Sequence, residues 1–275
     1  MKIPTMRLRN GEEMPMIGFG TYFTDNSKCM ESVLAALKSG YRMLDTATWY
    51  NNIELVAEAI KKSKVKRENI YITYKVLPGG YQDIVDDIFK TMETLNTTYL
   101  DLVLLHWPQG YILDSYKALE DLYNAGIVKA IGVSNYDHIL LDKILNKVRF
   151  KPMVNQIETH IYFQETKMHR YLEQKEIVHE SWAPFAEGYL GLLEDKKIAE
   201  IAKKYNKTPA QVILRFLIEK DIVVIPKSTN KDHIKENIKI FDFKLEEKDI
   251  KAIEKLDKKE QYSSWPGNMA IETIY

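Results

Sequence analysis

The sequence predicts an α/β fold, specifically a (β/α)8 TIM barrel with an N-terminal β-hairpin and two extra helices. Eight short β-rich runs alternate with amphipathic helical stretches, and such alternation is typical of a parallel sheet covered by helices. The chain has 275 residues, which is close to the usual length of a barrel. No Pro/Gly/Ser-rich or low-complexity linker divides it, so residues 1–275 are predicted to form one domain.

The predicted elements follow a regular order. Residues 5–16 alternate around Asn10-Gly11, a strong hairpin signal, so we expect a small hairpin that caps one end of the fold. Strands are predicted at residues 16–20, 42–45, 70–75, 100–105, 130–134, 153–158, 178–181 and 222–225. Helices are predicted at residues 28–39, 53–62, 82–95, 113–124, 138–145, 167–174, 209–219 and 232–238.

Two helical segments exceed the eight strand–helix units. Residues 196–205 and 246–256 carry apolar side chains at helical spacing, so each is expected to pack outside the ring. Residues 257–275 lack periodicity. We expect them to form a C-terminal tail on the surface.

Composition and charge exclude several classes of partner. The 39 basic and 39 acidic residues cancel, so no strong field is available to hold nucleic acid or an anionic membrane. Cys29 is the only cysteine, which rules out an internal disulfide and suits a reducing cytosol. The N-terminus lacks an apolar signal region, and no run approaches the roughly 18 apolar residues of a spanning helix. We expect a cytoplasmic monomer with no nucleic-acid, membrane or metal partner.

Three consecutive predicted strands, and the turn after the first of them, end in ionisable side chains: Asp45, Tyr50, Lys75 and His106. Because parallel strands present their carboxyl ends at one face of a barrel, these side chains are expected to meet there. Each alone has a simpler explanation, as a turn cap, a solvated strand end or a core histidine. Together they predict a proton-transfer site.

These four side chains suit the reduction of a carbonyl group. Hydride addition leaves a developing alkoxide that needs a proton, which Tyr50 can donate. A Lys75 ammonium about 4 Å from the phenol would contribute up to about 4 kcal/mol at an effective dielectric near 20, enough to lower the phenol pKa by up to about three. Asp45 would hold the ammonium in place, and His106 would orient the substrate oxygen or join the proton relay.

The hydride requires a cofactor, yet the sequence lacks a G-x-G-x-x-G fingerprint followed by a helix. Another candidate phosphate site follows the eighth predicted strand. Lys227 and Ser228 precede a helix that begins near Asp232, and helix N-termini after strands 7 and 8 of barrels often bind phosphates. A capped helix start with a surface lysine explains this stretch equally well.

A series of motifs occurs in the order of one known family. They are GFGTY (18–22), DTATWYNN (45–52), ITYK (72–75), LLHWP (104–108), GVSNY (132–136), VNQIETH (154–160), SWAPF (181–185), IPKSTN (225–230) and IKEN (234–237). On these motifs the sequence resembles the aldo-keto reductases over residues 5–256. The resemblance implies a barrel that reduces aldehydes or ketones to alcohols by hydride transfer from NADPH. Its catalytic tetrad would be Asp45, Tyr50, Lys75 and His106, with Tyr50 as the general acid.

The resemblance also implies where NADPH binds. Ser134, Asn135 and Gln156 would bind the nicotinamide carboxamide, and Trp182 would stack on the nicotinamide ring; hydroxyl and amide groups suit an amide, and an indole offers a flat apolar face. The 2′-phosphate and adenine would contact Lys227, Ser228, Glu236 and Asn237. The other predicted cofactor contacts are Gly20, Thr21, Tyr22, Asp45, Pro184, Phe185, Thr229, Asn230 and His233.

The substrate would meet Tyr22, Trp49, Tyr50, His106 and Trp107 according to the same resemblance. The aromatic members of this set predict a pocket that favours planar or apolar carbonyls over highly polar sugars, with broad specificity. Trp265 in the short tail is expected to cover only part of it.

Three departures from the family pattern stand out. Asn51-Asn52-Ile53 replaces the usual Gly-Asn-Glu, which changes a turn next to the tetrad. Ala183 stands where serine is common, and His233 stands where the family has an arginine six residues after the phosphate lysine. His233 predicts only a moderate preference for NADPH. Two other functions stay open: a non-catalytic regulatory subunit that senses the nicotinamide cofactor, and a barrel isomerase or lyase that uses no nicotinamide.

Overall fold

The computed structural model describes residues 3–23 and 25–263. In this part of the chain, eight parallel strands form one sheet in which each strand pairs with its neighbour in the sequence. The strands are β3 (Phe19–Gly20), β4 (Met43–Ala47), β5 (Tyr71–Val76), β6 (Leu102–Leu105), β7 (Ile131–Ser134), β8 (Val154–Glu158), β9 (Val178–Trp182) and β10 (Val223–Val224). The predicted α/β barrel is confirmed.

The first and last strands close the sheet on itself. An isolated parallel bridge joins Ile17 to Val224, and backbone hydrogen bonds run from Gly18 N to Val224 O (2.9 Å) and from Val224 N to Met16 O (3.1 Å). The regular ladders of β3 and β10 cover only two residues each, fewer than the sequence predicted. A Cβ on Gly20 would lie 2.9 Å from Ile225 O, so the close approach of these strands requires glycine there.

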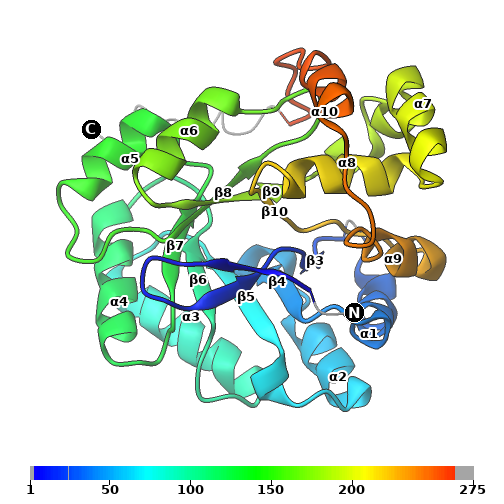
Figure 1. Ribbon diagram of the computed structural model, residues 1–275. Helices are drawn as coiled ribbons and strands as arrows, with labels where there is room; N and C mark the ends of the chain where they lie inside the picture. Colours follow the sequence, from blue (N-terminus) through cyan, green and yellow to red (C-terminus); the bar gives the residue numbers. More distant parts are fainter. Residues whose placement is uncertain (1–2, 24, 264–275) are drawn as a thin grey trace.

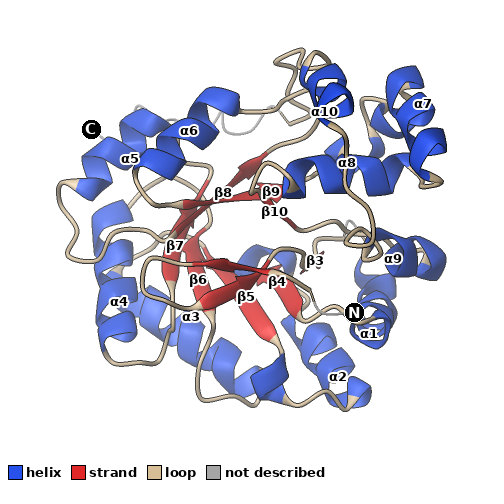
Figure 2. Ribbon diagram, viewed as in Figure 1, coloured by secondary structure: helices blue, strands red, loops and turns tan. Residues whose placement is uncertain are grey.

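Helices surround the strands on the outside (Figures 1 and 2). They are α1 (Cys29–Ser39), α2 (Ile53–Ser63), α3 (Tyr81–Thr94), α4 (Ile112–Asn124), α5 (His138–Leu145), α6 (Thr166–Gln174), α7 (Lys196–Tyr205), α8 (Pro209–Ile218), α9 (Lys231–Asn237) and α10 (Glu247–Glu254). The predicted extra helices are α7 and α10, which contact each other through Asp249, whose Oδ2 accepts a 2.6 Å hydrogen bond from Tyr205 Oη. In the described residues, no helix is long and apolar enough to cross a membrane.

Helix α8 shows how local sequence sets an element boundary. Thr208 accepts a hydrogen bond from Gln211 N at 3.3 Å, while the Gln211 side chain accepts one from Thr208 N at 3.1 Å. This reciprocal pair is a capping box, and Pro209 occupies the first helical turn, where its missing N–H leaves no bond unmade. Thr208 and Pro209 also line the main cavity.

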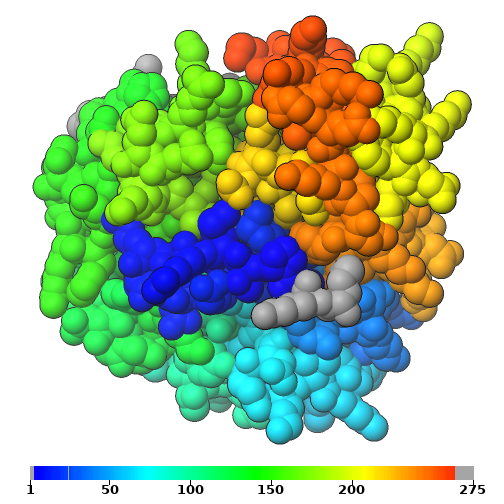
Figure 3. Space-filling view, viewed as in Figure 1, coloured from blue at the N-terminus to red at the C-terminus, as the bar shows by residue number. Residues whose placement is uncertain are grey.

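The N-terminal hairpin lies at the end of the barrel where the strands begin. Strands β1 (Thr5–Arg7) and β2 (Glu13–Pro15) pair antiparallel, and in Figure 3 this blue segment crosses the middle of the visible face. Asn10 Nδ2 donates to Lys129 O at 2.9 Å, and Arg9 Nε donates to Glu176 O at 3.3 Å. Both carbonyls precede barrel strands, so the predicted cap is confirmed and the opposite end stays open.

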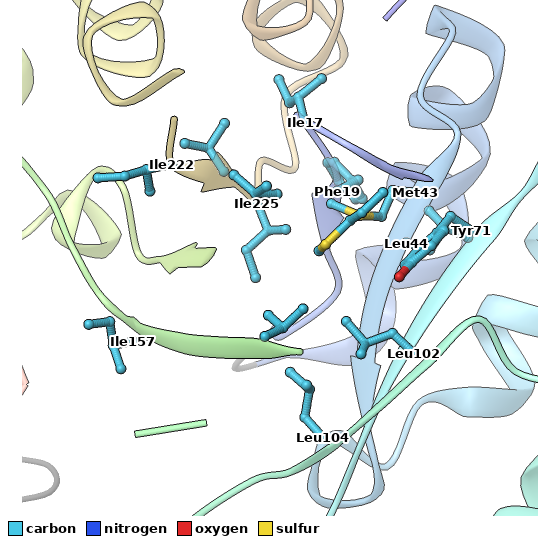
Figure 4. Close-up of a cluster of buried hydrophobic side chains, with 14 of the residues drawn as sticks. Ile17, Phe19, Met43, Leu44, Tyr71, Leu102, Leu104, Ile157, Ile222 and Ile225 are labelled. Carbon is cyan, nitrogen blue, oxygen red and sulfur yellow. The ribbon is translucent and has the colours of Figure 1, made fainter. Parts of the chain in front are cut away.

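Apolar side chains from the strands form most of the core of the barrel. Every residue of β6 is buried, as expected for a parallel strand covered on both faces. Figure 4 shows Leu102 and Leu104 of β6 in one cluster with Phe19 and Ile225. The same cluster contains Tyr71, Ile157 and Met43 from other strands.

Candidate active site

The four predicted tetrad residues lie in or just after three neighbouring strands, although β4 continues two residues beyond Asp45, where the predicted strand ended. Asp45 belongs to β4, Lys75 to β5, and His106 follows β6 directly. Tyr50 ends η2 (Thr48–Tyr50), the 3-10 turn that follows β4. The structure therefore brings together the residues that the sequence pattern grouped.

Asp45 and Lys75 form an ion pair in which each side chain is only 2% exposed. Gln156 of β8 braces this pair with its amide: Lys75 Nζ donates to Gln156 Oε1 at 2.9 Å, and Gln156 Nε2 donates to Asp45 Oδ2 at 2.8 Å. Burial opposes the charge of Lys75, but the Asp45 carboxylate and Tyr50 outweigh it and raise the pKa of Lys75. The ammonium is thus held charged behind Tyr50.

A fifth ionisable residue, Glu180 of β9, joins this network and was missed by the sequence analysis. Gln156 Nε2 donates its second hydrogen bond to Glu180 Oε2 at 2.8 Å, and Glu180 is completely buried. Burial raises the pKa of Glu180 to about 8, and the negative charge of Asp45 acts in the same direction. The predicted strand continues past Glu180, so the strand-end pattern that identified the tetrad did not identify this residue.

Tyr50 is a weaker acid in the folded chain than the sequence argument proposed. Burial raises the pKa of Tyr50 to about 12, and the positive charge of Lys75 lowers it by less than burial raises it. The expectation of a net lowered pKa is therefore wrong, because moving a phenolate out of water outweighs one nearby ammonium. Lys75 still acts in the predicted direction, with its Nζ 5.2 Å from the centroid of the Tyr50 ring.

His106 is a neutral imidazole held among aromatic rings. Burial, and then the positive charge of Lys75, hold the pKa of His106 well below its ordinary value. Its ring lies edge-on to Tyr50 with centroids 5.7 Å apart and stacks on Trp107 at 5.5 Å. Among the described residues His106 Nδ1 has no hydrogen-bond partner.

Tyr22 and Trp49 complete the aromatic wall predicted for the substrate side. Their rings stack with centroids 6.0 Å apart, and Tyr22 also lies 5.1 Å from the Tyr50 ring. Trp49 is 41% exposed whereas Trp107 is 4% exposed, so Trp49 presents far more surface to an incoming molecule.

An elongated cavity of about 800 Å³ opens over the tetrad and runs to α9. The predicted residues that line it are Gly20, Tyr22, Asp45, Trp49, Tyr50, His106, Trp107, Ser134, Asn135, Gln156, Trp182, Pro184, Phe185, Lys227, Ser228, Thr229, His233, Glu236 and Asn237. Three predicted residues are not in the lining. Lys75 sits behind Asp45, Thr21 is buried, and Asn230 caps α9 by accepting a hydrogen bond from Asp232 N at 2.8 Å.

At the tetrad end, amide and hydroxyl groups are already fixed by bonds within the chain. Ser134 Oγ donates to Gln156 O at 2.8 Å, and Asn135 Nδ2 donates to His106 O at 3.0 Å. Trp182 Nε1 donates to Asn135 Oδ1 at 2.8 Å. These bonds fix the orientation of the polar groups beside the half-buried Trp182 indole. That these residues bind a carboxamide stays a prediction.

The far end of the cavity is more open and carries positive charge. Lys227 Nζ lies 5.6 Å from the centroid of the Phe23 ring, and His233 is exposed on α9. Ser228 and Thr229 stand between them in the lining. Cationic and hydroxyl groups of this kind suit a phosphate.

The loop that follows β9 contributes lining residues that the motifs did not reveal. Ala183, Ala186 and Glu187 all have positive φ, at 48°, 47° and 50°, which is strained backbone for residues other than glycine. Glu187 lines the cavity, as do Gly188 and Leu193 further along the chain and Thr208 and Ala210 at the start of α8. The unusual backbone at Ala183 falls at one of the noted departures from the family pattern.

Tyr262 from the C-terminal stretch also reaches the cavity. Its ring stacks on Tyr189 at 5.4 Å and lies edge-on to Trp182 at 6.3 Å, and its backbone N donates to Glu158 Oε1 at 2.6 Å. Because this stretch has no periodicity, Tyr262 could not be predicted from the sequence. Trp265, the tail residue predicted to cover part of the pocket, lies outside the described residues.

The turn after Tyr50 accommodates its unusual residues without contacting the ion pair. Asn51 adopts a left-handed backbone with φ of 48°, a conformation that asparagine tolerates. Asn52 Nδ2 donates to Thr21 O at 2.7 Å. This bond ties the Tyr50 turn to the loop after β3.

Known proteins of one family resemble this chain over nearly its whole length. The model of the Aldo/keto reductase family matches residues 16–258. The glyoxal reductase of Bacillus subtilis (strain 168) is 41% identical over 269 residues, covering 96% of this chain and 97% of that protein. The methylglyoxal reductase of Salmonella typhimurium is 37% identical over 261 residues, covering 94% and 95%. A crystal structure of an aldo-keto reductase from a Medee basin deep-sea metagenome library superposes with a TM-score of 0.91 at 40% identity, covering 94% of this chain and 96% of that one.

Proposed function

The chain belongs to the aldo/keto reductase family, and from this premise we propose that it reduces aldehydes or ketones to alcohols with hydride from NADPH, Tyr50 donating the proton. One observation carries the proposal. The buried Asp45–Lys75 pair stands behind Tyr50, at the inner end of a cavity long enough to continue to Lys227 and His233.

The donor chemistry along the cavity fits NADPH. Trp182 would cover one face of the nicotinamide, and Ser134 and Asn135 stand beside it to meet the carboxamide. Lys227, Ser228 and His233 would hold the 2′-phosphate, with Glu236 and Asn237 near the adenine. When bound there, the cofactor would supply the hydride that adds to the carbonyl carbon.

The side chains of the tetrad would then complete the reaction. With a pKa of about 12, Tyr50 keeps its proton at neutral pH, and a developing alkoxide is the stronger base and takes it. The Lys75 ammonium stabilises the phenolate left behind, and Asp45 and Gln156 keep that ammonium in place. Neutral His106 can donate an N–H bond to the carbonyl oxygen without competing for the proton.

We propose small α-oxoaldehydes as the preferred substrates. Relatives named glyoxal reductase and methylglyoxal reductase support this choice. The stacked rings of Tyr22 and Trp49 offer flat faces that suit a short planar dicarbonyl. A screen of glyoxal, methylglyoxal, aromatic aldehydes and open-chain sugars with NADPH tests it, and sugars as the best substrates would contradict it.

We further propose a cytosolic monomer that prefers NADPH to NADH. Cys29 is buried and the only cysteine, so the chain needs no oxidising compartment. The cofactor preference would rest on Lys227, Ser228 and His233, which line the outer end of the cavity.

The Tyr50→Phe variant tests the proposed proton donor. Removing one oxygen preserves the ring contacts with Tyr22 and His106, so the variant should still bind NADPH while turnover falls roughly 10²- to 10⁴-fold. Single-turnover rates with saturating NADPH measure the loss, and quenching of intrinsic fluorescence measures cofactor binding. Turnover near the wild-type rate would remove Tyr50 from the mechanism, and a wild type that binds NADPH but reduces no carbonyl would favour a cofactor-sensing role.

A further inference from the structure

Glu180 lies inside the barrel next to the tetrad, and the proposed mechanism gives it no task. It is the middle residue of β9, paired in register with Gln156 of β8 and Val223 of β10. Its Oε2 accepts from Gln156 Nε2 at 2.8 Å. Its Oε1 has no hydrogen-bond partner among residues 3–23 and 25–263.

The charges around Glu180 do not balance if every carboxyl group is ionised. Asp45 from β4 takes the direct ion pair with Lys75 from β5, and Glu180 reaches that ammonium only through the Gln156 amide. Tyr71 of β5 also feels the charge of Glu180, but burial raises the Tyr71 pKa well above its ordinary value, so the phenol is neutral. Two buried carboxyl groups therefore share one ammonium.

We propose that Glu180 is a positioning residue that works in its protonated form, so that Asp45 and Lys75 are the only charges behind Tyr50. A neutral carboxyl still accepts the hydrogen bond from Gln156 and so fixes the amide that braces the ion pair. The raised pKa of Glu180, about 8, agrees with this state at neutral pH. This role of Glu180 rests on the proposed function, because it concerns how well Tyr50 donates a proton.

Ionisation of Glu180 should weaken the reaction. A second carboxylate beside Asp45 would partly cancel the field of Lys75 at Tyr50 and so disfavour the phenolate that forms when the proton leaves. Carbonyl reduction by the wild type should therefore slow as pH rises through about 8, the pKa of Glu180. The change in rate should be several-fold rather than complete, because Lys75 remains in place.

The same proton links folding stability to pH. In the unfolded chain Glu180 would lose its proton near its ordinary pKa of 4.5, whereas the folded chain retains it to about 8. Between these values the folded state binds more protons, so stability falls as pH rises. Removing the titrating group should abolish this part of the pH dependence.

Glu180→Gln is the decisive variant, because glutamine keeps the shape and the acceptor oxygen but cannot ionise. Single-turnover reduction at saturating NADPH should match wild type within about twofold at pH 6.5 and lack the wild-type decline between about pH 7 and pH 9. Glu180→Leu, also neutral, should lack the decline too but be slower at every pH, because Gln156 loses its acceptor. Glu200→Gln, at an exposed position on α7, is the surface control and should keep the wild-type profile.

Two kinetic outcomes would overturn the proposal. One is that the decline of the wild type persists in Glu180→Gln. The other is a loss above tenfold in that variant at pH 6.5 with NADPH affinity unchanged, which would mean that the carboxylate form is needed. Thermal unfolding of wild type and Glu180→Gln from pH 5 to pH 9 needs no turnover. The Tm advantage of the variant should grow with pH up to about 8, and a constant difference would also overturn the proposal. If wild type reduces no carbonyl, the proposed function fails, but thermal unfolding still determines the protonation state of Glu180. If Glu180→Gln does not fold, Glu180→Leu takes its place in both experiments.

Discussion

At one end of the cavity Asp45 and Lys75 are each 2% exposed and paired directly, while at the other end Lys227 is half-buried and His233 is exposed. The inner charges are fixed by each other and by Gln156. The outer charges face solvent, where salt screens them and pairs contribute little. The two ends should therefore respond differently to substitution, salt and pH.

The inner end shows how burial and charge compete. Burial raises the pKa values of Tyr50 and Glu180 and lowers that of His106, keeping all three neutral near pH 7. The Asp45–Lys75 pair is then left as the charge that acts on the phenol. Such a site uses few charges but holds each one in a defined place.

The largest effect is expected when the buried pair is broken. Lys75→Met keeps the length of the side chain but leaves Asp45 unpaired, so stability should fall by about 3–5 kcal/mol, and turnover should fall roughly 10²- to 10⁴-fold. Urea unfolding and single-turnover kinetics measure the two losses.

The double variant Asp45→Asn/Lys75→Met separates the two consequences. It removes the unpaired charge and should recover most of the stability, but without the ammonium it should recover little activity. If the double variant were as unstable as the single one, the cost would lie in packing rather than in charge.

The tetrad could be predicted because the predicted strands end at Asp45, at Lys75 and just before His106, and barrel geometry brings such residues together, although β4 itself continues to Ala47. Glu180 could not, because its predicted strand continues past it and its importance depends on Gln156 reaching across from β8. The strand and helix order followed from periodicity, but β3 and β10 are shorter than predicted, since they meet through close backbone contacts that periodicity does not encode.

The direction of the Tyr50 pKa shift also could not be predicted from the sequence. Proximity of Lys75 follows from adjacent strands, but the extent of burial depends on rings from Tyr22 and His106. Tyr262 is a similar case, because its place against Trp182 depends on a backbone bond to Glu158 at a distant strand end.

A smaller and more selective effect is expected from the outer end. Lys227→Met should weaken NADPH binding by an amount equivalent to at most roughly 1.5–3 kcal/mol, the contribution of a hydrogen bond to a charged group before solvent screening reduces it, and should leave NADH nearly unchanged. The salt dependence of NADPH binding should also decrease, because one screened charge is gone. Lys231→Met is the matched control: Lys231 begins α9 but is absent from the cavity lining. Equal losses for both cofactors would show that Lys227 contacts a part that they share.

The smallest expected effect concerns His233, which lines the outer end from the exposed side of α9. An arginine at this position could bind a phosphate through two N–H groups, whereas an imidazole lacks this planar pair of donors. The NADPH preference of the wild type should thus be moderate. His233→Arg should tighten NADPH binding several-fold and leave NADH unchanged. His138→Arg, at another exposed histidine far along the chain on α5, adds the same charge away from the cavity and should alter neither constant. Dissociation constants of the wild type and His233→Arg for both cofactors test this prediction. Equal changes for NADPH and NADH would mean that position 233 does not face the 2′-phosphate, and the contrast between the two ends would then rest on Lys227 alone.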